Sequence, residues 1–179
     1  MKRDIHLIAE ISIAVALAMV LNMLPLWRMP QGGSVSLEML PILLIALRRG
    51  VKAGMFTGLS HGFLQLAFGA SIFHPVQVFL DYPVAYLLLG LAGIFSSIIY
   101  TADKKINYTL VIIAVLFGSL ARFFSHFISG IIFFGHFAPE GQSEWLYSLI
   151  YNGSFMLPSI IICLLLAVPI LRILKETNI

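Results

Sequence analysis

The sequence predicts an all-α integral membrane protein, a bundle of six transmembrane helices with both ends of the chain in the cytoplasm. Three observations support this prediction: the composition, the length of the apolar segments and the positions of the basic residues. Of the 179 residues, 60% are hydrophobic and only 11% are charged. A soluble domain carries roughly 25% charged residues, so this chain has too little polar surface to remain dissolved in water.

Six apolar segments have about the length of a spanning helix, which needs about 20 residues, although the second is short. No soluble domain or long linker separates them, so we expect one membrane domain over residues 1–179. The segments do not alternate with a period of two, which excludes the strands of a membrane β-barrel. The expected helices cover about residues 7–27, 36–47, 51–69, 75–100, 108–135 and 144–171.

The first segment follows Lys2 and Arg3, as the apolar part of a signal peptide would. It continues from Leu7 to about Leu26 without a convincing cleavage site. The apolar part of a signal peptide is about 7–15 residues long, so this length indicates a retained spanning helix.

The third segment carries a glycine at every fourth residue: Gly50, Gly54, Gly58 and Gly62. Small residues at this spacing let two helices approach closely, and we favour packing inside one bundle as their role. Ala14 and Ala18 in the first segment have the same spacing. They could serve internal packing or docking to another membrane subunit.

The basic residues predict the orientation, because cytoplasmic loops of membrane proteins are enriched in Lys and Arg. If the six helices cross the membrane one after another, nine basic residues fall on one side of it: Lys2, Arg3, Arg48, Arg49, Lys52, Lys104, Lys105, Arg172 and Lys175. The opposite side holds Arg28 alone, and Arg122 falls inside the fifth helix. Both ends of the chain are therefore expected inside.

Polar side chains at membrane depth are costly and are treated as functional-site candidates. They gather in the outer half of the predicted bundle, at Glu38, His61, Asp81, Arg122, His126, Tyr147 and Asn152, together with Gly130, Phe134 and neighbouring small and aromatic residues. A channel or proton relay would need polar groups through the full depth, whereas a site open only to the outside suits capture of an external ligand. The alternative is structural pairing, for example of Asp81 with Arg122.

The chemistry of these side chains favours a small cationic or polar heterocycle as the ligand. Aromatic faces attract cations, and a buried carboxylate can neutralise the charge. Asn and His can hydrogen-bond ring nitrogens and an exocyclic amine.

Six longer segments carry a resemblance to a known family. They read MPQGGSVS (29–36), ALRRGVKAG (46–54), HPVQVFLDYPVAY (74–86), RFFSHFISG (122–130), FGHFAPEG (134–141) and LYSLIYNGSFMLPS (146–159). Together they resemble the thiamine-specific S component of energy-coupling factor transporters over nearly the whole chain. The resemblance implies a six-helix bundle with both termini inside, in a prokaryotic plasma membrane.

The resemblance also implies partners and site residues. Thiamine would be captured from outside and delivered through a transmembrane coupling protein and two ATPase subunits, which hydrolyse the ATP. Asp81 would offset the thiazolium charge, while Tyr82 and Arg122 would meet the hydroxyethyl end or a phosphate on it. The aminopyrimidine would bind His126, Tyr147 and Asn152; Gly130 and Phe134 complete the predicted site, and Glu38 and His61 are further candidates. Ala14 and Ala18 match the docking alanines of the first helix. We expect no catalytic residue, metal ion, cofactor or nucleic-acid partner for this chain.

The first outer loop, Arg28–Ser36, is predicted to act as a lid, because Gly32 and Gly33 permit it to bend. The alternative is a plain connecting turn.

Two other functions remain open. A stand-alone secondary transporter of a cationic heterocycle would often have broken helices and inverted repeats, and no convincing internal repeat is present. A membrane enzyme could use a metal at His61, His74, His126 or His136, but no two of these histidines lie at i, i+4 and no H-E-x-x-H motif occurs.

Overall fold

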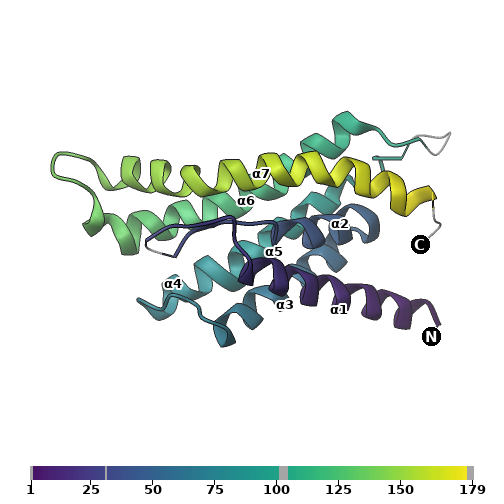
Figure 1. Ribbon diagram of the computed structural model, residues 1–179, viewed down its shortest axis with the longest axis horizontal. Coiled ribbons are helices and arrows are strands. Elements are labelled where there is room, and N and C mark those ends of the chain that lie inside the picture. Colours follow the sequence, from purple (N-terminus) through teal and green to yellow (C-terminus); the bar gives the residue numbers. More distant parts are fainter. Residues whose placement is uncertain (1, 31, 101–104, 177–179) are drawn as a thin grey trace.

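The computed structural model describes residues 2–30, 32–100 and 105–176, and these are almost entirely helical (Figure 1). Gln31 of the predicted lid and Lys104 lie outside the described residues, and the side chains of Lys2, Arg3 and Lys175 are likewise not described. The longer helices are α1 (Lys2–Met23), α2 (Met39–Arg49), α3 (Val51–Ala67), α6 (Tyr108–Phe134) and α7 (Glu144–Glu176). Between α3 and α6 the chain forms one helical segment of four parts: α4 (Pro75–Phe79), η1 (Leu80–Val84), α5 (Ala85–Leu89) and η2 (Gly90–Phe95). A single turn, η3 (Gly135–Phe137), extends α6.

Four helical segments within the described residues are long and apolar enough to cross a membrane: Ile5–Met23, Pro75–Phe95, Tyr108–Phe137 and Glu144–Leu174. Many of their large apolar side chains are exposed, as expected of surfaces that contact lipid. Helix α2 differs, because it has 11 residues and eight of them are buried. It is therefore a core helix surrounded by the others. The predicted class, a helical membrane protein, is confirmed.

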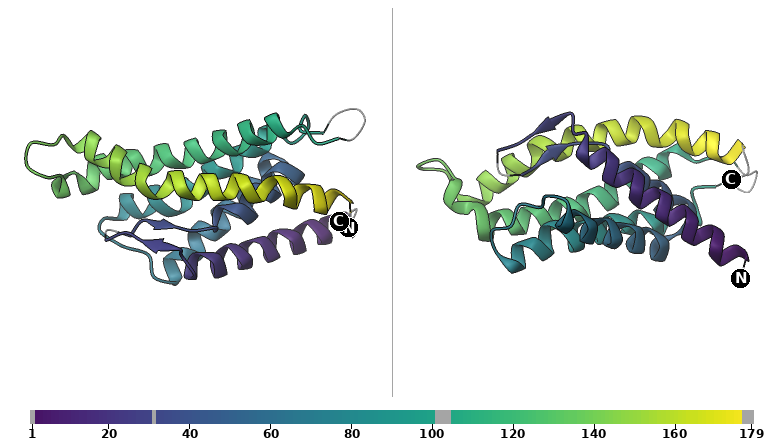
Figure 2. Two further views of the ribbon diagram at one scale, coloured as in Figure 1. Left: turned by 45° about the horizontal axis from the view of Figure 1, so that its top comes forward. Right: turned by 60° about the horizontal axis from the view of Figure 1, so that its bottom comes forward.

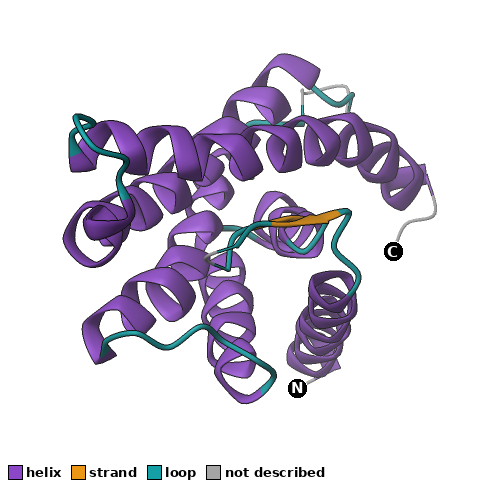
Figure 3. Ribbon diagram, turned by 60° about the vertical axis from the view of Figure 1, so that its left-hand side comes forward, coloured by secondary structure: helices purple, strands orange, loops and turns teal. Residues whose placement is uncertain are grey.

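Both described chain ends lie at one end of the bundle (Figures 1 and 2). The connection between α6 and α7 lies at the opposite end, and α6 and α7 pack along each other for much of their length. A short hairpin lies between α1 and the α6–α7 pair (Figure 3).

The hairpin replaces the end of the first predicted helix. Helix α1 stops at Met23, and Trp27–Arg28 (β1) pairs antiparallel with Ser34–Val35 (β2). Pro25 explains the difference, because proline disfavours the α conformation in the residue before it. The expected helix to about residue 27 was therefore too long, and the predicted lid is an ordered hairpin whose bend has Gly32 at a φ of 102°.

The glycines of α3 pack against the backbone of the next helical segment. A Cβ atom on Gly62 would lie 2.7 Å from the carbonyl oxygen of Tyr82, and one on Gly58 would overlap the carbonyl of Tyr86. Internal packing, the interpretation favoured from their spacing, is confirmed for these two. Gly50 has another role, because its φ of 88° forms the turn between α2 and α3.

Ala14 and Ala18 face the interior of the protein. Their exposed fractions are 7% and 0%, and Ala14 belongs to a cluster that includes Ile45 of α2 and Ala53 of α3. A partner subunit cannot contact these alanines in this conformation, which contradicts their predicted use as docking residues. Ser12 and Ala16 are exposed small residues of α1, also four residues apart.

Candidate functional site

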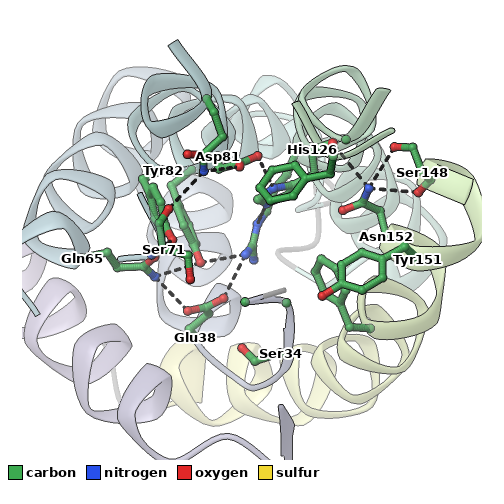
Figure 4. A pocket seen from close by; sticks show the side chains of 18 of the residues that line it. Ser34, Glu38, Gln65, Ser71, Asp81, Tyr82, His126, Ser148, Tyr151 and Asn152 are labelled. Atoms are coloured by element: carbon green, nitrogen blue, oxygen red, sulfur yellow. Dashed lines mark hydrogen bonds and ion pairs between the residues drawn. The ribbon is translucent and has the colours of Figure 1, made fainter. Parts of the chain in front are cut away.

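One cavity contains nearly all the predicted site residues. In this conformation the cavity has a volume of about 90 Å³. The predicted residues that line it are Glu38, Asp81, Tyr82, Arg122, His126, Gly130, Phe134, Tyr147 and Asn152. His61 is the one predicted ligand residue that does not (Figure 4).

Asp81 and Tyr82 lie on a widened helical turn. Pro83 has no N–H, and its ring would clash with the carbonyl of Phe79, so a regular α-helix cannot continue through it. The chain forms a π-helical turn over Leu80–Val84, a feature frequently found at functional sites. This turn brings both Asp81 and Tyr82 to the cavity wall.

The start of α4 holds Asp81 in place. His74 caps the helix through its ring Nδ1, which accepts from the N–H of Val76 at 3.1 Å. The Gln77 side-chain oxygen accepts from the N–H of Phe73 at 3.0 Å, which leaves its amide nitrogen to donate to Asp81 Oδ2 at 2.7 Å. A neutral amide thus orients this carboxylate.

His126 joins Asp81 to Arg122. Its Nδ1 lies 3.1 Å from Asp81 Oδ1, and its Nε2 lies 3.3 Å from Nε of Arg122. A guanidinium can only donate, so Nε2 must accept and the proton of His126 is on Nδ1, directed at Asp81. The hydrogen bonds therefore fix both the tautomer and the ring orientation of His126.

Arg122 is bound to Glu38 at the base of the cavity. Its Nη2 donates to Glu38 Oε1 at 2.9 Å and to the phenol oxygen of Tyr86 at 2.7 Å. The guanidinium carbon lies 4.1 Å from the centre of the Tyr86 ring. Glu38 also accepts from the amides of Asn22 at 2.6 Å and Gln65 at 2.9 Å. The alternative of a structural pair between Asp81 and Arg122 is not found, because Arg122 pairs with Glu38.

His61 lies below this network. It is fully buried and packs edge-on against Tyr86, with ring centres 4.6 Å apart. Its Nε2 is 2.8 Å from the amide nitrogen of Gln65. In this conformation His61 supports Gln65 and Tyr86 and does not reach the cavity.

Helix α7 supplies the opposite wall. Tyr147 and Tyr151 are stacked with ring centres 5.8 Å apart, and Tyr151 meets Phe155 edge-on at 6.0 Å. Asn152 directs its amide nitrogen to the backbone oxygen of Ser148 at 2.9 Å. Its amide oxygen is then the atom available to accept from a ligand.

Gly130 allows α6 and α7 to meet at this wall. A Cβ atom here would lie 3.0 Å from the amide nitrogen of Asn152 and would overlap the hydroxyl of Ser148. The glycine is therefore needed for packing behind the site.

The hairpin and aromatic residues also line the cavity. Gly32, Gly33 and Ser34 belong to its lining, and Phe134 packs edge-on against Phe73 at 5.0 Å. The hairpin therefore forms part of the cavity wall.

Several lining residues were not predicted: Asn22, Ser71, Gln77, Tyr86, Ser148 and Phe155. Helical spacing could have found two of them, because Gln77 precedes Asp81 by four residues and Tyr86 follows Tyr82 by four. Among the residues that the structure describes, no group of three His, Cys, Asp or Glu side chains is placed to hold a metal.

Residues 8–179 match the family model described as thiamine transporter protein (Thia_YuaJ). The chain is 49% identical over 162 residues to the thiamine transporter ThiT of Bacillus subtilis, covering 86% of this chain and 84% of that protein. It is 30% identical over 182 residues to the thiamine transporter ThiT of Lacticaseibacillus paracasei, covering 97% and 90%. The fold matches the solved structure of ThiT from Listeria monocytogenes with a TM-score of 0.85 at 30% identity, covering 98% of both chains.

Proposed function

This chain belongs to the thiamine transporter protein family, and on that premise we propose that it is the thiamine-binding subunit of an energy-coupling factor importer. The chain is a membrane protein, and its role is transport rather than catalysis. It captures thiamine from outside and passes it to a transmembrane coupling protein with two ATPase subunits. One observation carries the proposal: residues from five helical segments and a hairpin converge on one cavity that combines a carboxylate with stacked aromatic rings.

The proposed contacts follow from this chemistry. Asp81 faces the thiazolium charge, and Tyr147 and Phe134 offer the aromatic faces that attract a cation. His126 and Asn152 hydrogen-bond the aminopyrimidine. Tyr82 lies at the hydroxyethyl end, and its phenol oxygen already accepts from the N–H of Ser71 at 2.7 Å. Gly130 keeps space for these groups.

The proposed topology has six membrane crossings in a prokaryotic plasma membrane, with both ends inside. It is supported by the position of the two chain ends at one end of the bundle (Figure 1). Arg49 at the end of α2 forms an ion pair with Glu10 of α1, so the basic end of α2 lies on the side of the N-terminus. Basic residues favour the cytoplasmic side, which leaves the cavity facing outward.

The hairpin is proposed to be the lid of this site. It contributes Gly32, Gly33 and Ser34 to the cavity lining, and it connects the end of α1 to the start of α2. Closure of such a loop would remove the bound ligand from water.

The outward face of α1 is proposed to dock on the coupling protein. Ser12 and Ala16 are exposed and four residues apart, so a partner helix could approach closely there. Ala16→Trp should abolish thiamine uptake in a strain that carries the whole importer, while thiamine binding by the purified subunit stays unchanged. Normal uptake by this variant would place the docking surface elsewhere.

The first test is titration of the purified protein with thiamine, followed by tryptophan fluorescence and calorimetry. Trp27 lies in β1 of the hairpin, and Trp145 lies in the first turn of α7, two residues before Tyr147 of the cavity lining. Saturable binding that is lost in Asp81→Asn, and retained in the exposed control Glu140→Gln, supports the proposal. Absence of binding by both methods would remove thiamine as the ligand.

The coupling mechanism needs a separate test. Vesicles that contain this chain alone should take up no thiamine, and addition of the coupling protein and ATPases with ATP should start uptake. Uptake by the chain alone would favour a secondary transporter.

A further inference from the structure

The lining of the cavity contains more negatively charged than positively charged side chains. Among the described residues, the lining contains two carboxylates, Glu38 and Asp81, and one guanidinium, Arg122. Glu38 is 3% exposed and Arg122 is 5% exposed, so water screens this pair weakly. Asp81 has no cationic residue beside it, since its partners are the amide of Gln77 and the ring of His126.

The imidazole beside Asp81 is neutral. Nε2 of His126 faces Nε of Arg122, and Nε2 of His61 faces the amide nitrogen of Gln65. The guanidinium can only donate, so His126 accepts at Nε2 and carries its one proton on Nδ1. Nε2 of His61 also lies 3.7 Å from Glu38 Oε2, so this imidazole faces the same carboxylate as Arg122.

The charge balance therefore depends on Glu38. It neutralises Arg122, and one negative charge, on Asp81, remains for the ligand. If Glu38 were uncharged, the charges of Arg122 and Asp81 would cancel, and the cavity would contain an unpaired guanidinium, the side chain best suited to bind a phosphate.

We propose that Glu38 is a specificity-determining residue that engages Arg122 and thereby makes the site select thiamine over its anionic phosphate esters. This inference rests on the proposed function. A phosphate group carries about −1.5 to −2 charges near pH 7, and it would be repelled by the net charge of the site. To reach Arg122 it would have to displace Glu38 and leave that carboxylate buried without its partner, which is strongly unfavourable.

The test uses calorimetry on each variant to measure two dissociation constants, one for thiamine monophosphate and one for thiamine. The quantity compared between variants is the first constant divided by the second. Glu38→Gln should lower the ratio by about tenfold or more, because the buried pair is broken and Arg122 becomes available. The double variant Glu38→Gln with Arg122→Gln removes both charges of the pair, and its ratio should return to within about threefold of the original protein. Glu10→Gln removes the carboxylate of an ion pair outside the cavity and should leave the ratio unchanged.

Two results would overturn the inference. One is an unchanged ratio in folded Glu38→Gln. The other is a ratio in the double variant that is at least tenfold higher than in the original protein. Such a rise would mean that Arg122 binds the phosphate in the native site. The double variant keeps the charge balance of the interior, so it provides the test even where Glu38→Gln does not fold. Failure of the original protein to bind thiamine would overturn the proposed function instead.

Discussion

The backbone of Gly33 lies directly against the ring of Phe155, so that a Cβ atom on Gly33 would come within 2.6 Å of two ring carbons. This contact joins the hairpin to α7 in the wall of the cavity. No side chain larger than hydrogen fits there without movement of the hairpin or the ring.

Gly33→Ala should therefore loosen the hairpin from α7. Overpacking of this kind costs about 1–3 kcal/mol, so we expect thiamine to dissociate about tenfold faster, with a smaller change in the association rate. Stopped-flow fluorescence with the native tryptophans measures both rates. Gly153→Ala is the matched control, because its Cβ atom would meet nothing within 4 Å. Equal dissociation rates in the two variants would argue against the hairpin as a lid.

The close approach of α3 and α5 gives a prediction about stability. Gly58→Ala would push a methyl group into the backbone carbonyl of Tyr86, which cannot rotate away. We expect a loss of about 1–3 kcal/mol in the free energy of unfolding, measured in detergent by chemical denaturation. Gly153→Ala again serves as the comparison. A Gly58→Ala protein as stable as this control would mean that the two helices separate at little cost.

The buried ion pair of Arg122 and Glu38 should contribute far more to the stability of the protein than the exposed pair of Arg49 and Glu10. Arg122→Gln leaves Glu38 without its cation, and breaking such a buried pair costs about 3–5 kcal/mol. Arg49→Gln breaks the pair with Glu10, whose arginine is 39% exposed, and exposed pairs contribute about 0–1 kcal/mol. Unfolding of both variants under one set of conditions tests the difference. Similar losses would show that Glu38 finds other partners.

The π-helical turn should position Asp81. Pro83→Ala restores an N–H and permits a regular α-helical turn, which would rotate Asp81 relative to α5 by up to about 100°, the angle per residue of an α-helix. We expect thiamine affinity to fall by about tenfold or more while the protein stays folded. Pro169→Ala, also within a helix but outside the cavity, should leave affinity unchanged. Unaltered binding in Pro83→Ala would mean that tertiary packing alone holds the turn.

Most of the site residues could be predicted from the sequence, because helical spacing shows which residues of a single helix share a face. Arg122, His126, Gly130 and Phe134 follow one another at intervals of four residues, which places them on one broad face of a helix, and all four line the cavity. Asp81 was expected near the same depth and lies 3.1 Å from His126. Which residue would pair with Arg122 depends on tertiary packing, and the partner is Glu38 rather than Asp81, the example given for a structural pair.

The orientation of α1 could not be read from the sequence. Both faces of this helix are apolar, so the contrast that normally separates interior from surface is missing. Ala14 and Ala18 were chosen for their spacing, but Ser12 and Ala16 have the same spacing and are the exposed ones. The hairpin was missed because its strands have only two residues each, too few for a period of two to be visible.

The shortness of α2 has a consequence for how the protein enters the membrane. Its 11 residues span about 16 Å at 1.5 Å per residue, roughly half of the 30 Å hydrocarbon layer. The insertion machinery selects segments by length and hydrophobicity, so α2 is not a segment that it would retain alone. Gly50 connects α2 directly to α3, and the two helices can therefore enter as one hairpin. Glu38, one residue before α2, is then carried to its place opposite Arg122 only when the later helices arrive, so the binding site is completed in the last steps of assembly.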